Sequence, residues 1–182
     1  MAIASIGIFG NTMKQTALER FSDQARVIVV IPSNIKGFTS IEEGDFKTIE
    51  RLGNIEYAIP VKDERMMIKY KDSRAYVIVY GISEENLRKL YNAYDGDIKL
   101  KGSAVVGYRL VSNFGISVGE KISIGDKIYR VSGILEYQGL GGGLNPDNAV
   151  FLSMEDFDRI FEKEGYTSIV VKASSLEFVK GC

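Results

Sequence analysis

The sequence has no histidine and no tryptophan, and its single cysteine is Cys182, the last residue. Without histidine there is no Ser-His-Asp or Cys-His catalytic machinery and no zinc-binding helix of the HExxH type. One cysteine can neither close an internal disulfide nor build a structural zinc site, which needs four nitrogen or sulfur ligands. We therefore expect no catalytic residue, no cofactor and no metal site. An enzyme would have to use a pair of carboxylates, and no such pair stands out.

An excess of either charge is also lacking, because 23 basic and 24 acidic side chains leave a formal net charge of −1. Nucleic-acid binding needs a clustered basic excess, so we expect no nucleic-acid partner. A chain of 182 residues with 45% apolar side chains can bury roughly 70% of its unfolded surface. It is long enough for one compact domain, or for two small ones.

Long hydrophobic runs are missing as well. Residues 2–9 are almost continuously apolar, but eight residues extend only about 12 Å as a helix, whereas a membrane span needs roughly 20 residues. After them, Met13, Ala17, Leu18 and Phe21 form one apolar stripe of an amphipathic helix. Two interpretations are open: an amphipathic helix with an apolar first turn, or the last turns of a membrane helix that continues into water.

Strand-helix-strand units are predicted at both ends of the chain. The first comprises a buried strand at Arg26–Pro32, a helix within Ile41–Leu52 capped by Asp45, and a strand at Ile55–Val61 interrupted at Pro60. The second comprises a strand at Asn148–Ser153, a helix capped by Ser153 and ended by Gly165, and a strand at Thr167–Lys172. Their similar lengths indicate one sheet built from both ends.

The middle of the chain is then an insertion that is mostly β. It holds 11 of the 19 glycines, between Gly96 and Gly143, as tight turns and short strands require. Its predicted elements are strands at Met66–Tyr70, Ala75–Tyr80 and Ser103–Val106, a helix at Glu84–Tyr91, and a hairpin of Lys121–Ile124 and Lys127–Leu135 turning at Gly125-Asp126. The predicted class is α+β, with segments 1–23, 24–61 together with 148–182, and 62–147.

Two motifs look catalytic or metal-binding and are better explained as loops. Gly115-Ile-Ser-Val-Gly119 has the G-x-S-x-G pattern of a hydrolase nucleophile, but that motif needs a preceding strand, a following helix and a histidine. We expect a loop that leads into a hairpin. Asp95-Gly-Asp97 lacks the rest of a twelve-residue calcium loop, so we expect a polar turn.

A third motif, Gly139–Leu144, is rich in glycine and lacks the lysine of a phosphate-binding loop. We expect a mobile surface loop that presents its two leucines, because apolar loop tips often contact a partner or a membrane. The candidate partner-contact residues are Leu140, Gly141, Gly142, Gly143 and Leu144.

Several segments together resemble the extracytoplasmic core domain of ABC-transporter permeases of the MacB/FtsX/LolC type. Their order and spacing carry the resemblance, which runs over nearly the whole chain. The matching segments are Arg26–Ile31, Thr39–Pro60, Val79–Ile82, Val105–Gly107, Val118–Ile124, Tyr129–Leu135 and Asn148–Leu152. The sequence departs from the family pattern at Glu120, where aspartate is usual, and at Gly53-Asn54, where Pro-Gly is common. The central segment is also shorter than in drug-export members.

The resemblance implies a porter-like layer from the chain ends with an inserted β-rich subdomain. Residues 2–9 then look like the tail of a first membrane helix, and a second would follow the last strand, so we expect an excised domain of a longer permease. The amphipathic helix at residues 11–23 becomes the candidate mechanical link, through Met13, Ala17, Leu18 and Phe21.

The resemblance further implies that the domain lies on the extracytoplasmic side of the cell membrane and is not an enzyme. It would transmit motion driven by ATP hydrolysis on a cognate cytoplasmic ATPase, pair with a second permease copy or related subunit, and act on an extracytoplasmic protein or a lipid-like or small-molecule cargo. The alternative is a free-standing soluble binding module with no transport role.

Overall fold

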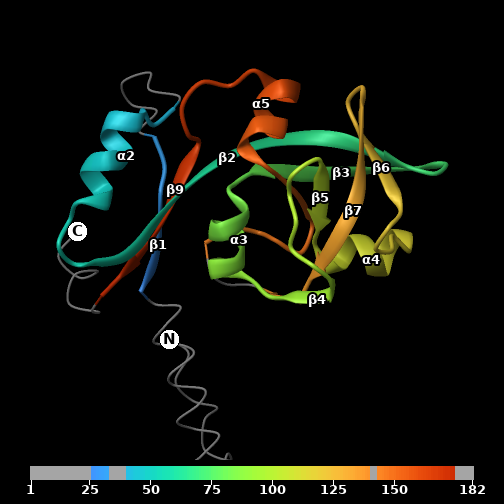
Figure 1. Cartoon of the computed structure of the whole chain (residues 1–182), viewed down its shortest axis with the longest axis horizontal. Coiled ribbons are helices and arrows are strands. Elements are labelled where there is room, and N and C mark those ends of the chain that lie inside the picture. Colours follow the sequence, from blue (N-terminus) through green and yellow to red (C-terminus); the bar gives the residue numbers. More distant parts are fainter. Residues whose placement is uncertain (1–25, 33–39, 140–142, 175–182) are drawn as a thin grey trace, which may run out of the picture.

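The computed structural model describes residues 26–32, 40–139 and 143–174, and within them the chain forms nine strands and four helices (Figure 1). The strands are β1 (Val27–Val30), β2 (Ile55–Tyr70), β3 (Ser73–Gly81), β4 (Ala93–Gly96), β5 (Ser103–Val106), β6 (Lys121–Ile124), β7 (Lys127–Leu135), β8 (Ala149–Leu152) and β9 (Ser168–Ala173). The helices are α2 (Glu43–Glu50), α3 (Glu84–Leu90), α4 (Tyr108–Phe114) and α5 (Met154–Phe161).

Strands β2, β3, β8, β5, β7 and β6 pair in that order, and β6 pairs again with β2, so these strands close into a small barrel. The β3–β8 and β5–β7 pairs are parallel, and the other pairs are antiparallel. Closure removes most of the free edges that an open sheet would expose. Strand β4 pairs with the last residues of β7, beyond those that pair with β6 and on the edge of β7 opposite β5.

A smaller sheet consists of β1, β9 and the first half of β2. Strand β2 is therefore shared: residues 55–61 pair with β9, and residues 62–70 pair with β3. Figure 1 shows β2 running unbroken from the small sheet, which lies beneath α2 at the left, to the barrel at the right. The chain ends thus do build one sheet as expected, but β8 lies in the barrel rather than beside β1 and β9.

The alternation of side chains along each strand divides the apolar residues between two main cores. Inward-facing residues such as Val77, Val131 and Val150 fill the barrel, together with Leu110 of α4 and Phe157 of α5. Outward-facing residues form a second core with α3; they include Tyr80, Val105, Leu135 and Phe151. A third, small cluster lies under α2 and contains Ile41, Ile169 and Val171.

Two glycines of the barrel are required by close backbone approach rather than by turn geometry. A Cβ atom at Gly107 would lie 1.9 Å from the carbonyl oxygen of Pro146, and one at Gly133 would lie 2.4 Å from that of Asp97. Backbone atoms cannot move away as a flexible side chain can, so any larger residue would force these backbone segments apart. Part of the glycine enrichment in the middle of the chain therefore reflects packing.

Several predicted elements are confirmed. Strand Ser103–Val106, the hairpin that turns at Gly125-Asp126 and the helix beginning at Glu84 are observed. Ser153 caps α5 as predicted, since its hydroxyl oxygen accepts from the amide of Asp156 at 3.1 Å. The α+β class is also confirmed, as a mixed sheet with a few helices.

Other predictions about element ends are wrong. Helix α2 begins after Glu42, and Asp45 lies inside its first turn instead of capping it. Helix α5 ends at Phe161, where Glu162 adopts a left-handed conformation with φ 49°, before the predicted stop at Gly165. Strand β1 is half-buried rather than fully buried, because it is an edge strand that pairs with β9 alone among the described strands.

Pro60 does not interrupt β2. The carbonyl of Val61 accepts from the amide of Thr167 on the β9 side, so the backbone of Pro60 points to the opposite side of the strand. Among the described strands, none pairs with that side of β2 at Pro60, because β3 begins to pair only at Lys62. The missing N–H of proline therefore removes no sheet hydrogen bond, and the predicted strands at residues 55–61 and 66–70 are one element.

Candidate functional site

The candidate site is the junction where β2 leaves the small sheet and enters the barrel. Lys62 stands at this crossing and is buried, with 7% of its surface exposed. Its ammonium donates to Asp158 Oδ1 of α5 at 2.6 Å and to the carbonyl oxygen of Lys163 at 2.8 Å. A buried ammonium is costly unless it is paired and hydrogen-bonded, and both requirements are met here.

The segment between α5 and β9 is attached to β2 by further polar contacts on the same side. Lys163 forms an ion pair with Glu64, and the pKa of that carboxyl is lowered mainly by this hydrogen bond. Lys163 also donates to the carbonyl of Asp63 at 3.2 Å, and Thr167 donates to the Asp63 carboxylate at 2.5 Å. Together with Lys62, these contacts fix α5 and the start of β9 onto β2.

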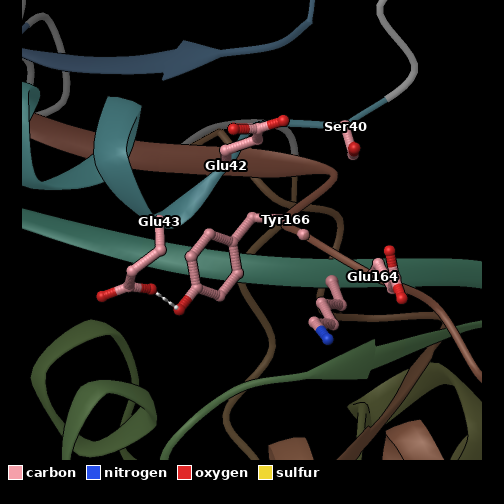
Figure 2. A pocket seen from close by; sticks show the side chains of 7 residues that line it. Ser40, Glu42, Glu43, Glu164 and Tyr166 are labelled. Carbon is pink, nitrogen blue, oxygen red and sulfur yellow. Dashed lines mark hydrogen bonds between the residues drawn. The ribbon is translucent and has the colours of Figure 1, made fainter.

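A cavity of about 310 Å³ opens beside this junction and is lined by Ser40, Glu42, Glu43, Lys62, Glu164, Gly165 and Tyr166. Figure 2 shows Tyr166 at its centre, with the hydroxyl directed toward Glu43. That hydroxyl donates to Glu43 Oε2 at 2.7 Å. Burial, and then this carboxylate, raise the pKa of Tyr166 to about 12, so the phenol stays protonated at neutral pH.

The chemistry of this cavity does not favour catalysis. The Lys62 amine is already bound by two acceptors, and the Tyr166 hydroxyl is a donor to a carboxylate. Within the described part of the chain, no group of three or more His, Cys, Asp or Glu side chains is arranged to hold a metal ion. The arrangement can connect structural elements, and the polar groups at the junction serve that purpose.

The G-x-S-x-G segment is a loop that leads into β6, as expected. Gly115 ends α4 in a left-handed conformation with φ 68°. The amide of Ser117 donates to the Glu120 carboxylate at 2.9 Å, and Tyr70 donates to the same group. Lys71, at 2.8 Å, and these hydrogen bonds lower the pKa of Glu120 to about 2. This carboxylate joins the loop to the β2–β3 turn.

The Asp95-Gly-Asp97 segment is the end of β4 and the residue after it, so the expected turn is wrong, but its carboxylates also have a structural explanation. Asp95 accepts from the amide of Gly96 at 2.8 Å, and Asp97 pairs with Arg88 at 2.9 Å and with Lys99 at 3.5 Å. Arg88 is the main reason that the pKa of Asp97 is lowered. Both carboxylates therefore serve local contacts.

The predicted partner-contact loop is described only at its ends. Leu140, Gly141 and Gly142 lie outside the described residues, while Gly143 has φ 87°. Leu144 is buried, with 8% of its surface exposed, and packs in the second core. The expectation that it is presented to solvent is therefore wrong, whereas the role of the loop in partner contact stays a prediction.

Asp147 holds the base of this loop and was missed by sequence reasoning. It is 2% exposed, and its carboxylate accepts from the amides of Gln138 and Gly139, each at 2.8 Å. The Pro-Asp dipeptide that follows the glycines is a turn signal and could have indicated this role.

The predicted mechanical-link residues Met13, Ala17, Leu18 and Phe21 all lie outside the described residues.

The family described as MacB-like periplasmic core domain matches residues 1–177. An uncharacterized ABC transporter permease of Methanocaldococcus jannaschii is 25% identical over 166 residues, which are 91% of this chain and 43% of that protein. A second such permease of the same organism is 30% identical over 119 residues, which are 58% of this chain and 29% of that protein. The chain therefore spans less than half the length of these two relatives.

Solved structures show the same fold. The extracellular domain of the noncanonic ABC-type transporter YknZ from Gram-positive bacteria is similar with a TM-score of 0.64 and 16% identity, over 85% of this chain and 87% of that one. The periplasmic region of MacB from Actinobacillus actinomycetemcomitans has a TM-score of 0.64 and 12% identity, over 85% of this chain and 77% of that one.

In the described residues of this chain, no helix combines the length and apolar character that crossing a membrane requires.

Proposed function

The chain belongs to the MacB-like periplasmic core domain family, whose fold it shares with the extracytoplasmic domains of ABC transporters, and on this premise we propose that it acts as a rigid lever outside the membrane. In this proposal the domain carries motion driven by ATP hydrolysis from a permease to a partner or cargo. The family match over residues 1–177 weighs against the alternative of a free-standing binding module.

The observation that carries the proposal is the continuity of β2. Strand β1, where the described chain begins, and β9, where it ends, lie side by side, with Val27 opposite Lys172. Strand β9 is hydrogen-bonded in turn to β2, which extends without a break into the barrel. A displacement applied where the chain enters β1 and leaves β9 is therefore passed through backbone hydrogen bonds to the barrel.

The junction around Lys62 supports the same proposal. A lever needs its two parts to move together, and the contacts from Asp158, Lys163 and Thr167 join the α5–β9 segment to β2 where the sheet changes partners. Without them, α5 and the start of β9 would be attached to β2 at this point mainly by sheet hydrogen bonds and apolar packing. The site is then a brace, which explains why its polar groups are already paired.

Family membership supports proposals for the remaining parts of the transport cycle. A cognate ATPase would hydrolyse ATP on the cytoplasmic side, so this domain itself would not be an enzyme. A second permease copy or related subunit would present a paired domain, and the cargo would be an extracytoplasmic protein, a lipid-like molecule or a small molecule. ATP-driven closure needs to favour one arrangement by only a few kcal/mol to shift its population strongly.

The test uses spin labels in the full-length permease assembled with its ATPase in nanodiscs. With Cys182 replaced by serine, one label is placed on α2 by Glu50→Cys and one on the β6–β7 turn by Asp126→Cys. We expect the distance between labels within one domain to stay constant on addition of a non-hydrolysable ATP analogue, while the distance between the Asp126→Cys labels of two copies changes. A change within the domain, with no change between copies, would refute the lever.

The mechanical link at residues 11–23 is tested separately. Ala17→Pro in the full-length permease should break a helix there at a cost of roughly 3 kcal/mol or more, and should abolish the ATP-dependent change between copies. Ala17→Leu, which preserves helix propensity, is the matched control and should leave the change intact. Unaltered movement in the proline variant would remove this helix from the proposal while leaving the β2 lever in place.

A further inference from the structure

The outer face of the barrel is bare at the end farthest from the small sheet. Near β9 and α3, outward-facing side chains such as Tyr80 and Phe151 are covered by the second core. Toward the β2–β3 turn this cover stops, and most outward positions of β2, β3, β6 and β7 are exposed. Five of these positions are basic and define what we name the basic strip: Arg65, Lys69, Arg74, Lys121 and Arg130.

The register of the sheet sets these cations opposite one another. Lys69 on β2 is directly opposite Arg74 on β3, and Lys121 on β6 is directly opposite Arg130 on β7. Like charges in directly opposed positions destabilise a sheet. The free domain therefore carries two unfavourable pairs on the same face, and an anionic partner would relieve both.

Carboxylates do not compensate these charges in the described part of the chain. No described ion pair includes any side chain of the basic strip. Arg130 donates to the carbonyl oxygen of Gly119 at 2.7 Å, which is a neutral acceptor. Glu64, the chain neighbour of Arg65, is paired with Lys163. The strip is thus a concentrated positive surface on a chain whose formal net charge is −1.

Apolar side chains lie among the cations. Met67 and Tyr76 are directly opposite each other on β2 and β3, and they are 52% and 60% exposed. Ile128 on β7 is 66% exposed and opposes Ser123, which is itself opposite Lys69. Exposed methionine, tyrosine and arginine side chains are enriched at protein–protein interfaces. The face therefore combines an apolar centre with a positive surround.

We propose that the basic strip is a docking surface for an acidic polypeptide segment of a partner protein. Charge complementarity selects an acidic partner, and the exposed methionine, tyrosine and isoleucine give it apolar contacts that a lipid headgroup would not fill. The location also favours a protein over a membrane surface. Arg65 is ten residues along β2 from Ile55, which is about 33 Å of strand. Because Ile55 pairs with Ala173 at the end where the chain leaves β9, the strip lies far from that end. This location argument rests on the proposed function, which sets the membrane at that end.

The binding test uses the 182-residue chain and two fluorescein-labelled peptides of about eight residues, long enough to span roughly 26 Å when extended. One alternates glutamate with leucine and tyrosine, and the other has glutamine in place of each glutamate. Fluorescence anisotropy should show binding of the glutamate peptide only, and its affinity should fall as salt is raised, because exposed charges are screened.

The discriminating variant removes one member of each like-charge pair, as Lys69→Gln with Lys121→Gln. It should bind the glutamate peptide about tenfold more weakly, and its Tm should stay unchanged or rise by about 1–4 °C, because the repulsion is relieved. The control, Lys47→Gln with Lys89→Gln, removes the same charge from the exposed faces of α2 and α3, where each lysine pairs with a glutamate. It should bind like the unchanged chain.

Three results would overturn the proposal: equal binding of the two peptides, equal weakening in the control, or no binding of the glutamate peptide.

Two further experiments identify other occupants. Salt-sensitive co-sedimentation with phosphatidylglycerol vesicles, lost in the Lys69→Gln, Lys121→Gln variant without peptide binding, would assign the strip to a membrane surface. Salt-sensitive dimerisation lost in that variant would assign it to a second copy of this chain. All these outcomes are independent of whether the domain moves as a lever.

Discussion

Removing the carboxylate of Asp158 from the junction should destabilise the domain more than removing the ammonium of Lys62. In Asp158→Ala, the Lys62 ammonium keeps only its bond to the carbonyl of Lys163, in a position where its side chain is 9% exposed. In Lys62→Met, an apolar side chain of similar length fills the buried position. The carboxylate of Asp158 is left 45% exposed, so water can solvate it.

The magnitudes follow from this asymmetry. A lost hydrogen bond to a charged group costs about 1.5–3 kcal/mol, and the exposure of Asp158 places the loss toward the lower part of that range. We expect Asp158→Ala to lower the free energy of unfolding by about 2 kcal/mol, which is a fall in Tm of about 4–8 °C for a chain of this size. Lys62→Met should stay within about 1 kcal/mol of the unchanged chain, because exchanging a buried ion for an apolar side chain is often neutral.

The assay is urea unfolding of the 182-residue chain at pH 7, followed by circular dichroism, with the two single variants and the double variant. In Lys62→Met with Asp158→Ala, the poorly satisfied ammonium is gone, so the double variant should be more stable than Asp158→Ala alone. The reasoning is refuted if Lys62→Met is as destabilising as Asp158→Ala, or if the double variant shows the sum of the two losses.

Three further outcomes are expected. The pKa of Glu120 falls from 4.5 to about 2 in the folded chain, mainly through Lys71. Its contribution to the stability of the fold is therefore full above pH 4.5 and is lost as the pH falls toward 2. Calorimetry should show a steeper loss of Tm over that window in the unchanged chain than in Glu120→Gln. Ser153→Ala should cost about 1 kcal/mol in urea unfolding, and Ser153→Thr should restore most of it, because threonine also caps helices. Gly107→Ala should prevent folding. Gly44→Ala lies in an open position of α2, where a Cβ meets nothing within 4 Å, and should stabilise the fold by about 0.5–1 kcal/mol. Soluble yield and Tm distinguish these two outcomes.

Sequence reasoning succeeded where the signal is local. The alternation in Lys127–Leu135, the Gly125-Asp126 turn and the Ser153 cap each depend on residues only a few positions apart, and all are observed. Helix α4 was missed because it is seven residues long and lies in a glycine-rich stretch. Strand β4 was missed because its four residues include the aspartate and glycine that indicated a turn.

The candidate site and the basic strip depend on contacts between distant parts of the chain. Lys62 and Asp158 are 96 residues apart, and neither residue type nor spacing shows that they meet. The alternation of Arg65, Met67 and Lys69 can be read from the sequence, but only the strand register places Lys69 opposite Arg74. Closure of the barrel through the short β2–β6 pairing is equally invisible in a linear pattern.

The predicted boundary between residues 61 and 62, where the first strand-helix-strand unit was expected to end, falls within β2. At that point the strand exchanges one neighbour for another: Val61 pairs with Ser168 of β9, and Lys62 pairs with Gly81 of β3. For the small sheet and the barrel to rotate against each other, β2 would have to bend between these two residues, against the brace at Lys62. Each backbone hydrogen bond broken in this way costs about 0.5–1.5 kcal/mol, and the polar contacts around Lys62 add to that cost. The predicted boundary therefore coincides with a rigid joint, and bending between the membrane and the barrel is expected outside β2.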